Sequence, residues 1–315
     1  MELRHIKYFL ALAEEGTFTR AAERLLIAQP PLSRQIKDLE EELGTELFVR
    51  TKRGVTLTEA GEKFRQYALQ IDHLSNQSIE ALKEMESGLQ GTLYIASVEG
   101  YAPHIISKWV SEFHTLFPGV EFNLWNGSSD DVLNRLQNGL CDLAVVIAPF
   151  DQERLQGIHI FDEPWVAMIP AGHPVLGNVS NENTSKENSS KENSSKENAA
   201  NEISLDELAP YELIIPSKHS RLQEITDWFS DKTVKPKVIC RVAHMLNAYE
   251  LTEQNVGIAI YPASAAMYAD ESKVVIKKLK NPSVTASYYL TKMIGRELTK
   301  VAEEFWDLVA EKEEN

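Results

Sequence analysis

Cysteine is scarce in this chain of 315 residues. Only Cys141 and Cys240 are present, and neither has a Cys or His neighbour at the spacing that zinc sites use. The eight histidines are equally scattered, with no pair spaced for a metal. These absences argue against a disulfide framework and a zinc site, and we expect two free thiols, no metal and no cofactor.

Long apolar runs and targeting signals are missing too. No stretch of about 18 apolar residues occurs, and the first residues, MELRHIKYFLALAEEG, lack a charged leader followed by a small-residue cleavage site. We therefore expect a cytoplasmic protein with no membrane partner.

Motifs of common enzyme classes are absent as well. The sequence holds no Gly-rich phosphate loop, no Gly-x-Ser-x-Gly turn around a nucleophile and no HExxH motif. Scattered Ser and His residues leave catalysis open in principle, but we do not predict an enzyme.

Positive charge is in short supply over the chain as a whole. The formal net charge of -15 argues against a surface that coats nucleic acid throughout, because phosphate would be repelled. However, residues 1–58 hold nine Lys or Arg and nine Asp or Glu, whereas the remainder holds 23 and 38. The acidity lies beyond residue 58, so local patches decide what the N-terminal segment binds.

What is present at the N-terminus is a series of three short helical patterns. Apolar residues recur at helical spacing from Leu3 to Glu15 until Gly16, a second pattern covers about Thr19 to Leu25, and a third begins near Pro31 and stops at Gly44. The tight connection LIAQ joins the second pattern to the third. This arrangement predicts a helix-turn-helix.

A hairpin pattern follows these helices. Residues 47–50 and 55–57 have strand character around an Arg53-Gly54 turn, which predicts a two-stranded wing with Arg50, Lys52 and Arg53 at its tip. The alternative is a surface hairpin with solvated charge. Together with the helices, the wing completes a predicted domain at residues 1–58.

Residues 59–89 have the pattern of one long helix that Thr58 caps. Its seam recurs at a spacing near 3.5 residues over almost four heptads: Phe64, Tyr67, Ile71, Leu74, Ser78, Leu82, Met85 and Leu89. Such a seam favours pairing with a partner helix, and packing on the chain's own domain is the alternative.

From residue 90 onward, strand and helix patterns alternate in two similar runs. The first run is TLYIASV, HIISKWVSEFHTLFP, VEFNLWNG, SDDVLNRLQNG and CDLAVVIA, and the second extends from YELIIPS to VGIAIYPAS. They predict two α/β lobes: lobe I at 90–162 and 264–315, closed by the strand SYYLTKM and the helix LTKVAEEFWDLVAE, and lobe II at 163–263. Within lobe II, residues 178–202 repeat Ser-Lys-Glu-Asn without apolar residues at the core of the repeat, which predicts a disordered insertion. A functional tether is the alternative.

The stretch FTRAAERLLIAQPPLSRQIKDLEEELGTELFVRTKRGVTLTEAG resembles the DNA-binding region of LysR-type transcriptional regulators. The resemblance covers the whole chain, and HTLFPGVEF, NGLCDLAVV, AGHPV and GIAIYPAS look like the family's effector domain. MELRHIKYF with IAQPPLSRQI is similar to the branch that responds to aromatic acids. The fold class that follows is α/β: a winged helix-turn-helix, a long linker helix and a two-lobed effector-binding domain resembling periplasmic binding proteins. The Ser-Lys-Glu-Asn tract departs from the family.

The predicted reading head for DNA is the start of the third helix, because a recognition helix presents its first turns to bases and phosphates. Gln29 and Ser33 are suited to bases or phosphate, and Arg34 is suited to guanine or phosphate. For Arg53, the resemblance to the family's wing implies a contact in the minor groove. The alternative for each charge is a solvated surface. The complete set of predicted DNA contacts is Thr19, Gln29, Pro30, Pro31, Ser33, Arg34, Lys37, Arg50 and Arg53.

The predicted effector site lies beyond the carboxyl ends of the strands, where helix N-termini point backbone N–H groups into the crevice. These strand ends are at residues 98–101, 126–130, 147–149, 216–220 and 243–245. Its predicted residues are Val98, Glu99, Gly100, Tyr101, Ser128, Ser129, Ile147, Ser217, His219 and His244. The serines could equally cap helices. By the resemblance, Gly100 and Ser129 fall where the aromatic-acid branch has ligand-contacting residues. Glu99 departs from that pattern, since a carboxylate disfavours an acid ligand unless it points away or is paired.

The function predicted from these observations is a DNA-binding transcriptional regulator that responds to a small-molecule effector, with small organic acids, aromatic acids among them, as the effector class. Its predicted partners are double-stranded promoter DNA, the effector, RNA polymerase and further copies of itself in a homodimer or homotetramer. One alternative keeps the DNA-binding module but makes the sensor ligand-free or controlled by Cys141 and Cys240. A more distant alternative is an α/β solute-binding or catalytic protein.

Overall fold

Three short helices and a hairpin form the N-terminal domain of the computed structural model, which describes residues 1–52, 54–87, 89–177, 201–217, 219–229, 235–280 and 284–313. The elements are α1 (Leu3–Glu15), α2 (Phe18–Arg24), α3 (Gln29–Leu43), β1 (Phe48–Thr51) and β2 (Gly54–Leu57). The apolar face of each helix turns into one core. That core includes Ile6, Phe9, Leu12, Leu32, Ile36, Leu39 and Leu47. The predicted winged helix-turn-helix is therefore present.

The start of α3 shows why two prolines are tolerated there. The helix begins at Gln29 rather than near Pro31, so that Pro30 and Pro31 occupy its first positions. Backbone N–H groups have no intrahelical partner in the first turn, and proline lacks one. At the other end, Gly44 closes the helix with a φ of 67°, a conformation that glycine adopts readily.

Hydrogen bonds hold the wing against the helices. Glu40 Oε1 accepts the backbone N–H groups of Leu47 (2.7 Å) and Phe48 (3.1 Å), and the Val55 N–H donates to the Gly16 carbonyl at 2.8 Å. These contacts link β1 to α3 and β2 to the end of α1. The wing therefore has a fixed position beside α3.

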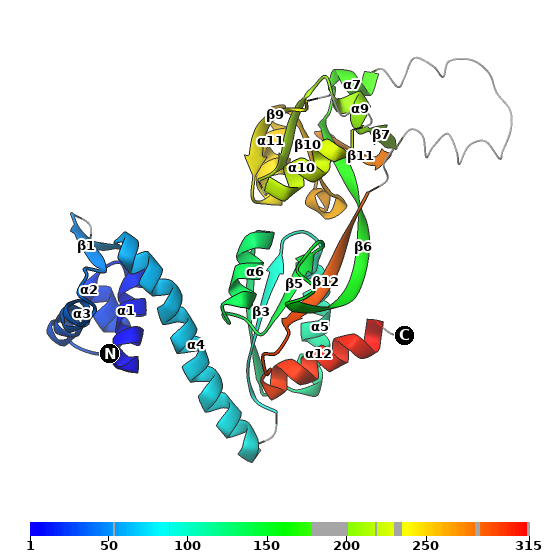
Figure 1. The fold of residues 1–315 in the computed structure, drawn as a ribbon. Helices are drawn as coiled ribbons and strands as arrows, with labels where there is room; N and C mark the ends of the chain where they lie inside the picture. Colours follow the sequence, from blue (N-terminus) through cyan, green and yellow to red (C-terminus); the bar gives the residue numbers. More distant parts are fainter. Residues whose placement is uncertain are drawn as a thin grey trace, which may run out of the picture.

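One long helix, α4 (Glu59–Ser87), packs its first half on the core of the N-terminal domain and leads to the start of lobe I (Figure 1). Thr58 caps it, because the Gly61 N–H donates to Thr58 Oγ1 at 2.9 Å. Further along, Gln77 Nε2 donates to Asp142 Oδ1 at 2.7 Å, beside a buried His73. The helix thus contacts lobe I through the middle of its length.

Lobe I is a twisted sheet with helices on both faces. Its strands are β3 (Gly91–Val98), β4 (Val120–Gly127), β5 (Leu143–Ile147), β12 (Thr285–Met293) and the first part of β6 (Leu155–Pro170), in the order β4-β3-β5-β12-β6. Strand β3 is parallel to β4 and β5, and β12 runs antiparallel to β5 and β6. Its helices are α5 (Ala102–Leu116), α6 (Ser129–Gln137) and α12 (Lys300–Glu313). In Figure 1, α6 lies on the opposite side of the sheet from α5 and α12.

Lobe II continues the same strand path through β6. Its strands are β8 (Glu212–Pro216), β9 (Lys237–Val242), β10 (Ile258–Pro262), β7 (Glu202–Ser204) and β11 (Val274–Lys280), in the order β6-β10-β8-β9 with β11 between β6 and β7. Its helices are α7 (Pro174–Gly177), α9 (Leu205–Leu208), α10 (His219–Asp227), α11 (Met245–Glu253) and the 3-10 helix η1 (Ala263–Ala266). Asn255, just after α11, has a positive φ (59°), a conformation that asparagine tolerates.

Strand β6 belongs to both lobes, and this corrects the lobe limits that we expected. Residues 155–164 pair with β12 in lobe I, whereas 165–170 pair with β10 and β11 in lobe II. Strand β11 therefore lies in lobe II, although 264–315 was expected in lobe I. The chain returns to lobe I only after β11, because the antiparallel partner of β11 is the far end of β6.

The structure describes only the last two residues of the expected insertion at 178–202. Residues 178–200 lie outside the described residues, so the structure does not bear on the interpretation of this tract as disordered. At its expected end, however, Glu202 begins β7, and the Asn201 carbonyl accepts the Lys278 N–H at 2.9 Å. Residues 201 and 202 are therefore part of lobe II and not of a disordered insertion.

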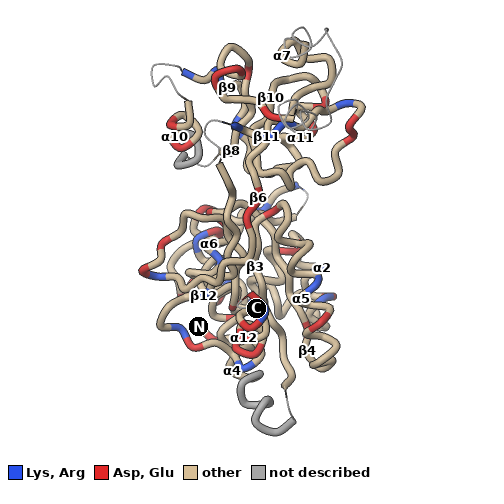
Figure 2. Tube along the Cα trace, turned by 90° about the vertical axis from the view of Figure 1, so that its right-hand side faces the viewer, with Lys and Arg blue, Asp and Glu red and all other residues tan. Residues whose placement is uncertain are grey.

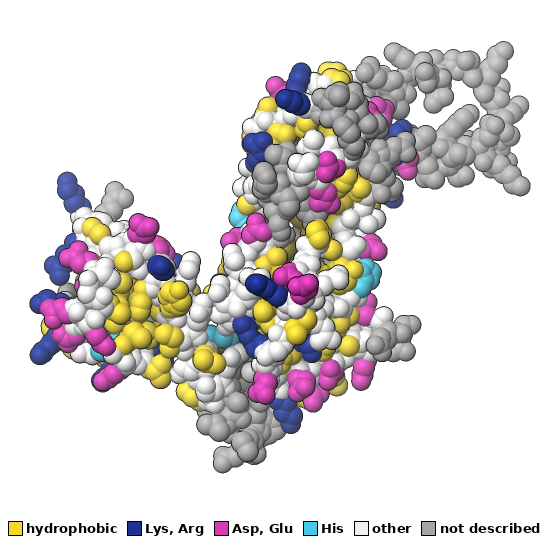
Figure 3. Space-filling view, in the orientation of Figure 1, with side chains coloured by type: hydrophobic (Ala, Val, Ile, Leu, Met, Phe, Trp, Pro, Cys, Tyr) yellow, Lys and Arg dark blue, Asp and Glu magenta, His cyan; other side chains and the backbone are white. Residues whose placement is uncertain are grey.

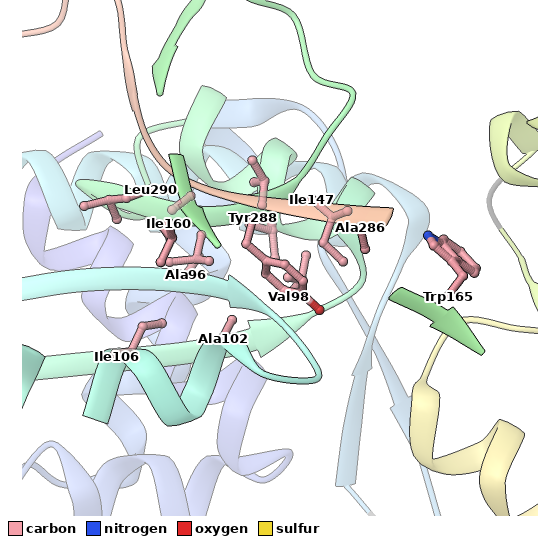
Figure 4. Close-up of a cluster of buried hydrophobic side chains, with 14 of the residues drawn as sticks. Ala96, Val98, Ala102, Ile106, Ile147, Ile160, Trp165, Ala286, Tyr288 and Leu290 are labelled. Carbon is pink, nitrogen blue, oxygen red and sulfur yellow. The ribbon is translucent and has the colours of Figure 1, made fainter. Parts of the chain in front are cut away.

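The buried core of lobe I extends up to the boundary between the lobes. Figure 4 shows Val98, Ile147 and Tyr288 at the end of this core that faces Trp165. Within the part of the chain that the structure describes, no helix is long and apolar enough to cross a membrane. Among those same residues, no group of three or more His, Cys, Asp or Glu side chains could hold a metal ion.

Candidate functional site

The outer face of α3 carries most of the side chains predicted to contact DNA. Leu32, Ile36 and Leu39 point into the core, which leaves the opposite face of the helix to solvent. Ser33 is half-buried there, and the exposed members of the predicted set are Gln29, Pro30, Pro31, Arg34 and Lys37. The first turns of α3 thus present polar groups outward.

Within the described part of the chain, Arg34 is the cation on this face without a hydrogen-bond or ion-pair partner. Among the described residues, no hydrogen bond or ion pair involves its guanidinium, whereas Lys37 Nζ lies 3.2 Å from Glu41 Oε1. On α2, Arg20 pairs with Glu15 at 3.0 Å, and Arg24 pairs with Glu14. Arg34 is therefore available for an external anion without breaking an existing bond.

The remaining predicted DNA contacts lie on either side of α3. Thr19 is exposed on α2 and Arg50 is exposed on β1, but Arg53 lies outside the described residues. Figure 3 shows Lys and Arg side chains projecting from the outer edge of the N-terminal domain, on the side away from the two lobes. In Figure 2, Asp and Glu are spread over both lobes and along α12, as the charge count predicts.

A second candidate site is a cleft between the lobes, with a cavity volume of about 90 Å³. It lies where β3, β4, β5, β8 and β10 end, at the edge where ligands of such sheets bind. The lining residues that we predicted are Val98, Glu99, Ser128, Ser129, Ile147 and Ser217.

Glu99 resolves an alternative that the sequence left open. Its carboxylate is paired: Oε2 accepts the Met245 N–H at 2.7 Å, and Oε1 lies 2.6 Å from His244 Nδ1. Both partners belong to lobe II, whereas Glu99 follows β3 of lobe I. The side chain therefore connects the two lobes at the cleft.

Ser128 acts as a helix cap in this structure. Its Oγ accepts the Asp131 N–H at 3.3 Å at the start of α6 and donates to Asp131 Oδ2 at 2.6 Å. This is the capping role that the sequence offered as an alternative to ligand binding. Ser128 nevertheless lines the cavity, so the two roles are compatible.

Three of the predicted effector residues do not line this cavity. Gly100 borders a separate hollow next to α11, and Tyr101 borders another hollow with Phe161 and Glu163. His244 contacts Glu99 but is absent from the lining. The side chain of His219 lies outside the described residues.

Several cleft residues are not among the single residues that we predicted for the effector site. They are Gly127, Asp130, Trp165, Pro216, Ala243, Met245, Tyr261 and Pro262. Five of them, Gly127, Asp130, Pro216, Ala243 and Met245, fall within the strand-end segments where the sequence predicts a ligand, although they were not among the single residues chosen. Trp165 and Tyr261 lie within strands and are buried, and no local pattern marks them as cavity residues.

Behind the cleft, a buried carboxylate joins the lobes a second time. Glu163 Oε2 accepts the Ser264 N–H at 2.7 Å, and Oε1 accepts the hydroxyls of Ser264 and Tyr288. Burial, and then the charge of Glu163, raise the pKa of Tyr288 well above its ordinary value. Tyr288 therefore stays a hydrogen-bond donor, and this network fixes η1 to the strands of lobe I.

Two family profiles match the chain. The profile of the "Bacterial regulatory helix-turn-helix protein, lysR family" matches residues 3–62, and that of the "LysR substrate binding domain" matches 86–188 and 193–314. The first match contains α1, α2, α3 and the wing, and the second contains both lobes.

The chain is also similar to named regulators. It is 38% identical to the HTH-type transcriptional regulator BudR of Raoultella terrigena over 56% of this chain and 62% of that protein. It is 38% identical to AlsR of Bacillus subtilis (strain 168) over 57% and 60%. These matches thus span about three fifths of each relative. The crystal structure of full-length CbnR with its target DNA has a TM-score of 0.69 at 21% identity, covering 99% of this chain and 100% of that one.

Proposed function

Because the chain belongs to the LysR family of bacterial helix-turn-helix regulators, we propose that it is a regulator of transcription that binds promoter DNA and not an enzyme. The observation that carries this proposal is the exposed start of α3 with its unpartnered Arg34. A helix with such a start can enter the major groove while the wing reaches the neighbouring backbone. Because promoter DNA lies in the bacterial cytoplasm, we propose that the protein acts there. RNA polymerase would be a further partner.

The roles that we propose for single residues follow from their positions. Arg34, Ser33 and Gln29 read bases or grip phosphate, and Pro30 and Pro31 shape the approach of the first turn. Thr19, Lys37 and Arg50 supply phosphate contacts around it, and Arg53 enters the minor groove. The proposed units are a DNA-binding domain at 1–58, a linker at 59–89 and an effector domain beyond residue 90.

We propose that α4 brings two copies together, since one winged helix-turn-helix covers only a half-site. Tyr67 and Leu74 support this, because they lie one heptad apart on α4 and are 54% and 64% exposed. Two such dimers would form a homotetramer. The side chains of Leu82 and Met85, further along the seam, lie outside the described residues.

A substitution in this seam tests the dimer. Leu74→Asp places a charge in the proposed interface, so the dissociation constant of the dimer, measured by sedimentation, should rise by at least about tenfold, in line with the cost of burying an unpaired charge. Gln66→Asp, at another exposed position of α4, should leave association unchanged. Equal association of Leu74→Asp and wild type would rule out this seam.

We propose that the cleft between the lobes binds a small-molecule effector. Its position at the strand ends and its lining of hydroxyl and apolar groups support a small ligand. The acid class, aromatic acids included, rests on the sequence resemblance alone. An effector controls the protein only if it binds one arrangement of the lobes better than another.

The experiment that tests the regulator proposal is selection from genomic DNA. The full-length protein is mixed with sheared DNA of the organism that encodes it, and the retained fragments are sequenced. We expect a small number of sites upstream of genes, each holding two half-sites with related sequences. Uniform retention, or none at moderate salt, would contradict the proposal.

A further inference from the structure

The carboxylate of Glu99 already occupies an anion position inside the cleft. Its Oε2 accepts the Met245 N–H at 2.7 Å, and its Oε1 lies 2.6 Å from His244 Nδ1. Both oxygens are therefore engaged by the N-terminal end of α11. Such charge-assisted bonds are stronger than bonds between neutral groups.

Helix α11 has no side-chain cap of its own. His244 stands at its N-cap position, and no cap hydrogen bond comes from that side chain. The first N–H groups of a helix lack intrahelical partners and favour a negative group. Glu99 meets this need from the opposite lobe and so takes the place that a ligand carboxylate would take.

The turn after β3 holds Glu99 in this place. Gly100 follows it with a φ of 87°, and a Cβ atom at Gly100 would lie 2.4 Å from Ser264 Oγ and 3.2 Å from Met245 Sδ. Only glycine fits this approach of lobe I to lobe II. The backbone on the C-terminal side of Glu99 is thus fixed against α11 and η1.

The charge of the other lining residues also disfavours a bound acid. Glu99 and Asp130 both line it, and none of the described lining residues is Lys or Arg. An acid that enters would meet two carboxylates and a helix end that is already capped. Its carboxylate can bind at α11 only after Glu99 has moved away.

We propose that Glu99 is a specificity-determining residue of the effector site: an internal carboxylate that an acid effector must displace from α11. This inference rests on the effector function proposed above for the cleft. Displacement removes a hydrogen-bonded link between the lobes, which gives the bound and free states different lobe contacts. Acids that contribute little besides a carboxylate are therefore rejected, and acids with additional apolar contacts to the cleft are accepted.

The test compares acid binding by wild type and Glu99→Gln. Full-length proteins are titrated with acetate and with benzoate by calorimetry. The Gln side chain keeps the size but loses the charge, so we expect at least one acid to bind about tenfold more tightly, the scale of one charge-assisted hydrogen bond. Asp130→Asn removes the other cleft carboxylate, and Glu121→Gln removes an exposed charge elsewhere on lobe I. Both controls should gain clearly less.

Each other outcome overturns the inference. Equal acid binding by Glu99→Gln and wild type shows that Glu99 does not compete with the acid. An equal gain in Asp130→Asn shows that the acid senses only the total negative charge of the cleft. Loss of binding in Glu99→Gln makes Glu99 a direct ligand contact. If neither protein binds either acid, the inference fails, while retained selection of genomic sites leaves the regulator proposal standing. Should Glu99→Gln not fold, His244→Ala loosens the same carboxylate and should show a smaller gain.

Discussion

At the scale of single residues, Gly61 shows how closely α4 is fitted to the wing. It lies in the first turn of α4, and a Cβ atom there would lie 2.1 Å from the Leu47 carbonyl oxygen and 3.0 Å from Leu57 Cδ2. Alanine normally favours a helix over glycine by up to about 1 kcal/mol. Here that preference is opposed by a clash with backbone, which cannot move aside cheaply.

We expect Gly61→Ala to lower the free energy of unfolding of the protein by about 1–3 kcal/mol, the usual range for overpacking. Chemical denaturation followed by circular dichroism measures it. Gly177→Ala is the matched control, because no atom of the described residues lies within 4 Å of a Cβ atom at that helical glycine. A Gly61→Ala protein as stable as wild type would show that the wing does not pack on α4 in this way.

The two thiols provide a test of the cysteine-controlled alternative. Cys141 is 3% exposed in lobe I, and burial raises the pKa of its thiol to about 12, with the charge of Asp142 as a further cause. Cys240 lies half-buried on β9 of lobe II. Since the thiolate is the reactive form, Cys141 should be inert at neutral pH.

Iodoacetamide at pH 8 should therefore modify at most Cys240 in the native protein and both thiols after denaturation, as read by intact mass. DNA binding by the Cys141→Ser variant should respond to peroxide as wild type does. Rapid labelling of Cys141 in the native state, or a peroxide response that depends on it, would favour redox control.

At the scale of elements, the contact between α4 and lobe I depends on a buried polar group. Asp142 accepts Gln77 Nε2 at 2.7 Å and the Tyr94 N–H at 2.9 Å. His73 packs edge-on against Tyr94, with ring centroids 4.4 Å apart, and its Nε2 lies 4.0 Å from Asp142 Oδ1, beyond hydrogen-bond distance. Burial and the charge of Arg296 lower the pKa of His73 below 6.5.

This pKa shift predicts a loss of stability in acid. When the pH falls below 6.5, His73 gains a proton more readily in the unfolded chain than in the folded one, so the unfolded state is favoured. The contribution of neutral His73 is present above that pH and is lost below it. His73→Phe keeps a ring against Tyr94 and does not titrate, so its unfolding free energy should fall less than that of wild type between pH 7.5 and 5.5, by up to about 1 kcal/mol. Identical falls would contradict this account of the contact.

Which elements could be predicted from the sequence depended on local signals. Gly16, Gly44 and Thr58 mark helix ends directly, and α1, α2 and α3 follow from apolar spacing. The division of strand β6 between the two lobes has no such local signal. Its first part pairs with β12 and its second part with β10 and β11, and all three strands lie far along the chain. The lobe limit near β11 was wrong for the same reason.

The same distinction holds for the candidate sites. The rule that ligands bind beyond strand ends placed Val98, Ser128, Ile147 and Ser217 at the cavity. Glu99 pairs with His244, which lies 145 positions further along the chain. Neither segment alone indicates that the two side chains meet. Trp165 was missed because its contact with the cavity depends on how the two lobes face each other.

At the scale of the whole molecule, the distribution of charge matches the arrangement of the parts. The segment up to residue 58 has equal numbers of basic and acidic residues, and all of the net -15 lies beyond it. In Figure 1 the N-terminal domain stands at one end of α4, apart from both lobes. Repulsion by phosphate would therefore keep the acidic lobes away from DNA and leave contact to α3 and the wing.

The measurement that tests the central claim most directly is the affinity of Arg34→Ala for DNA across a range of salt concentrations. Using a genomic site selected by wild type, we expect binding to weaken by about 1–3 kcal/mol if Arg34 reads a base, or the slope of log affinity against log salt to shrink by about 0.9 if it holds a phosphate. Arg241→Ala, an equal charge change on β9 of lobe II, should bind like wild type. If Arg34→Ala matches wild type in both affinity and slope, α3 is not the reading head.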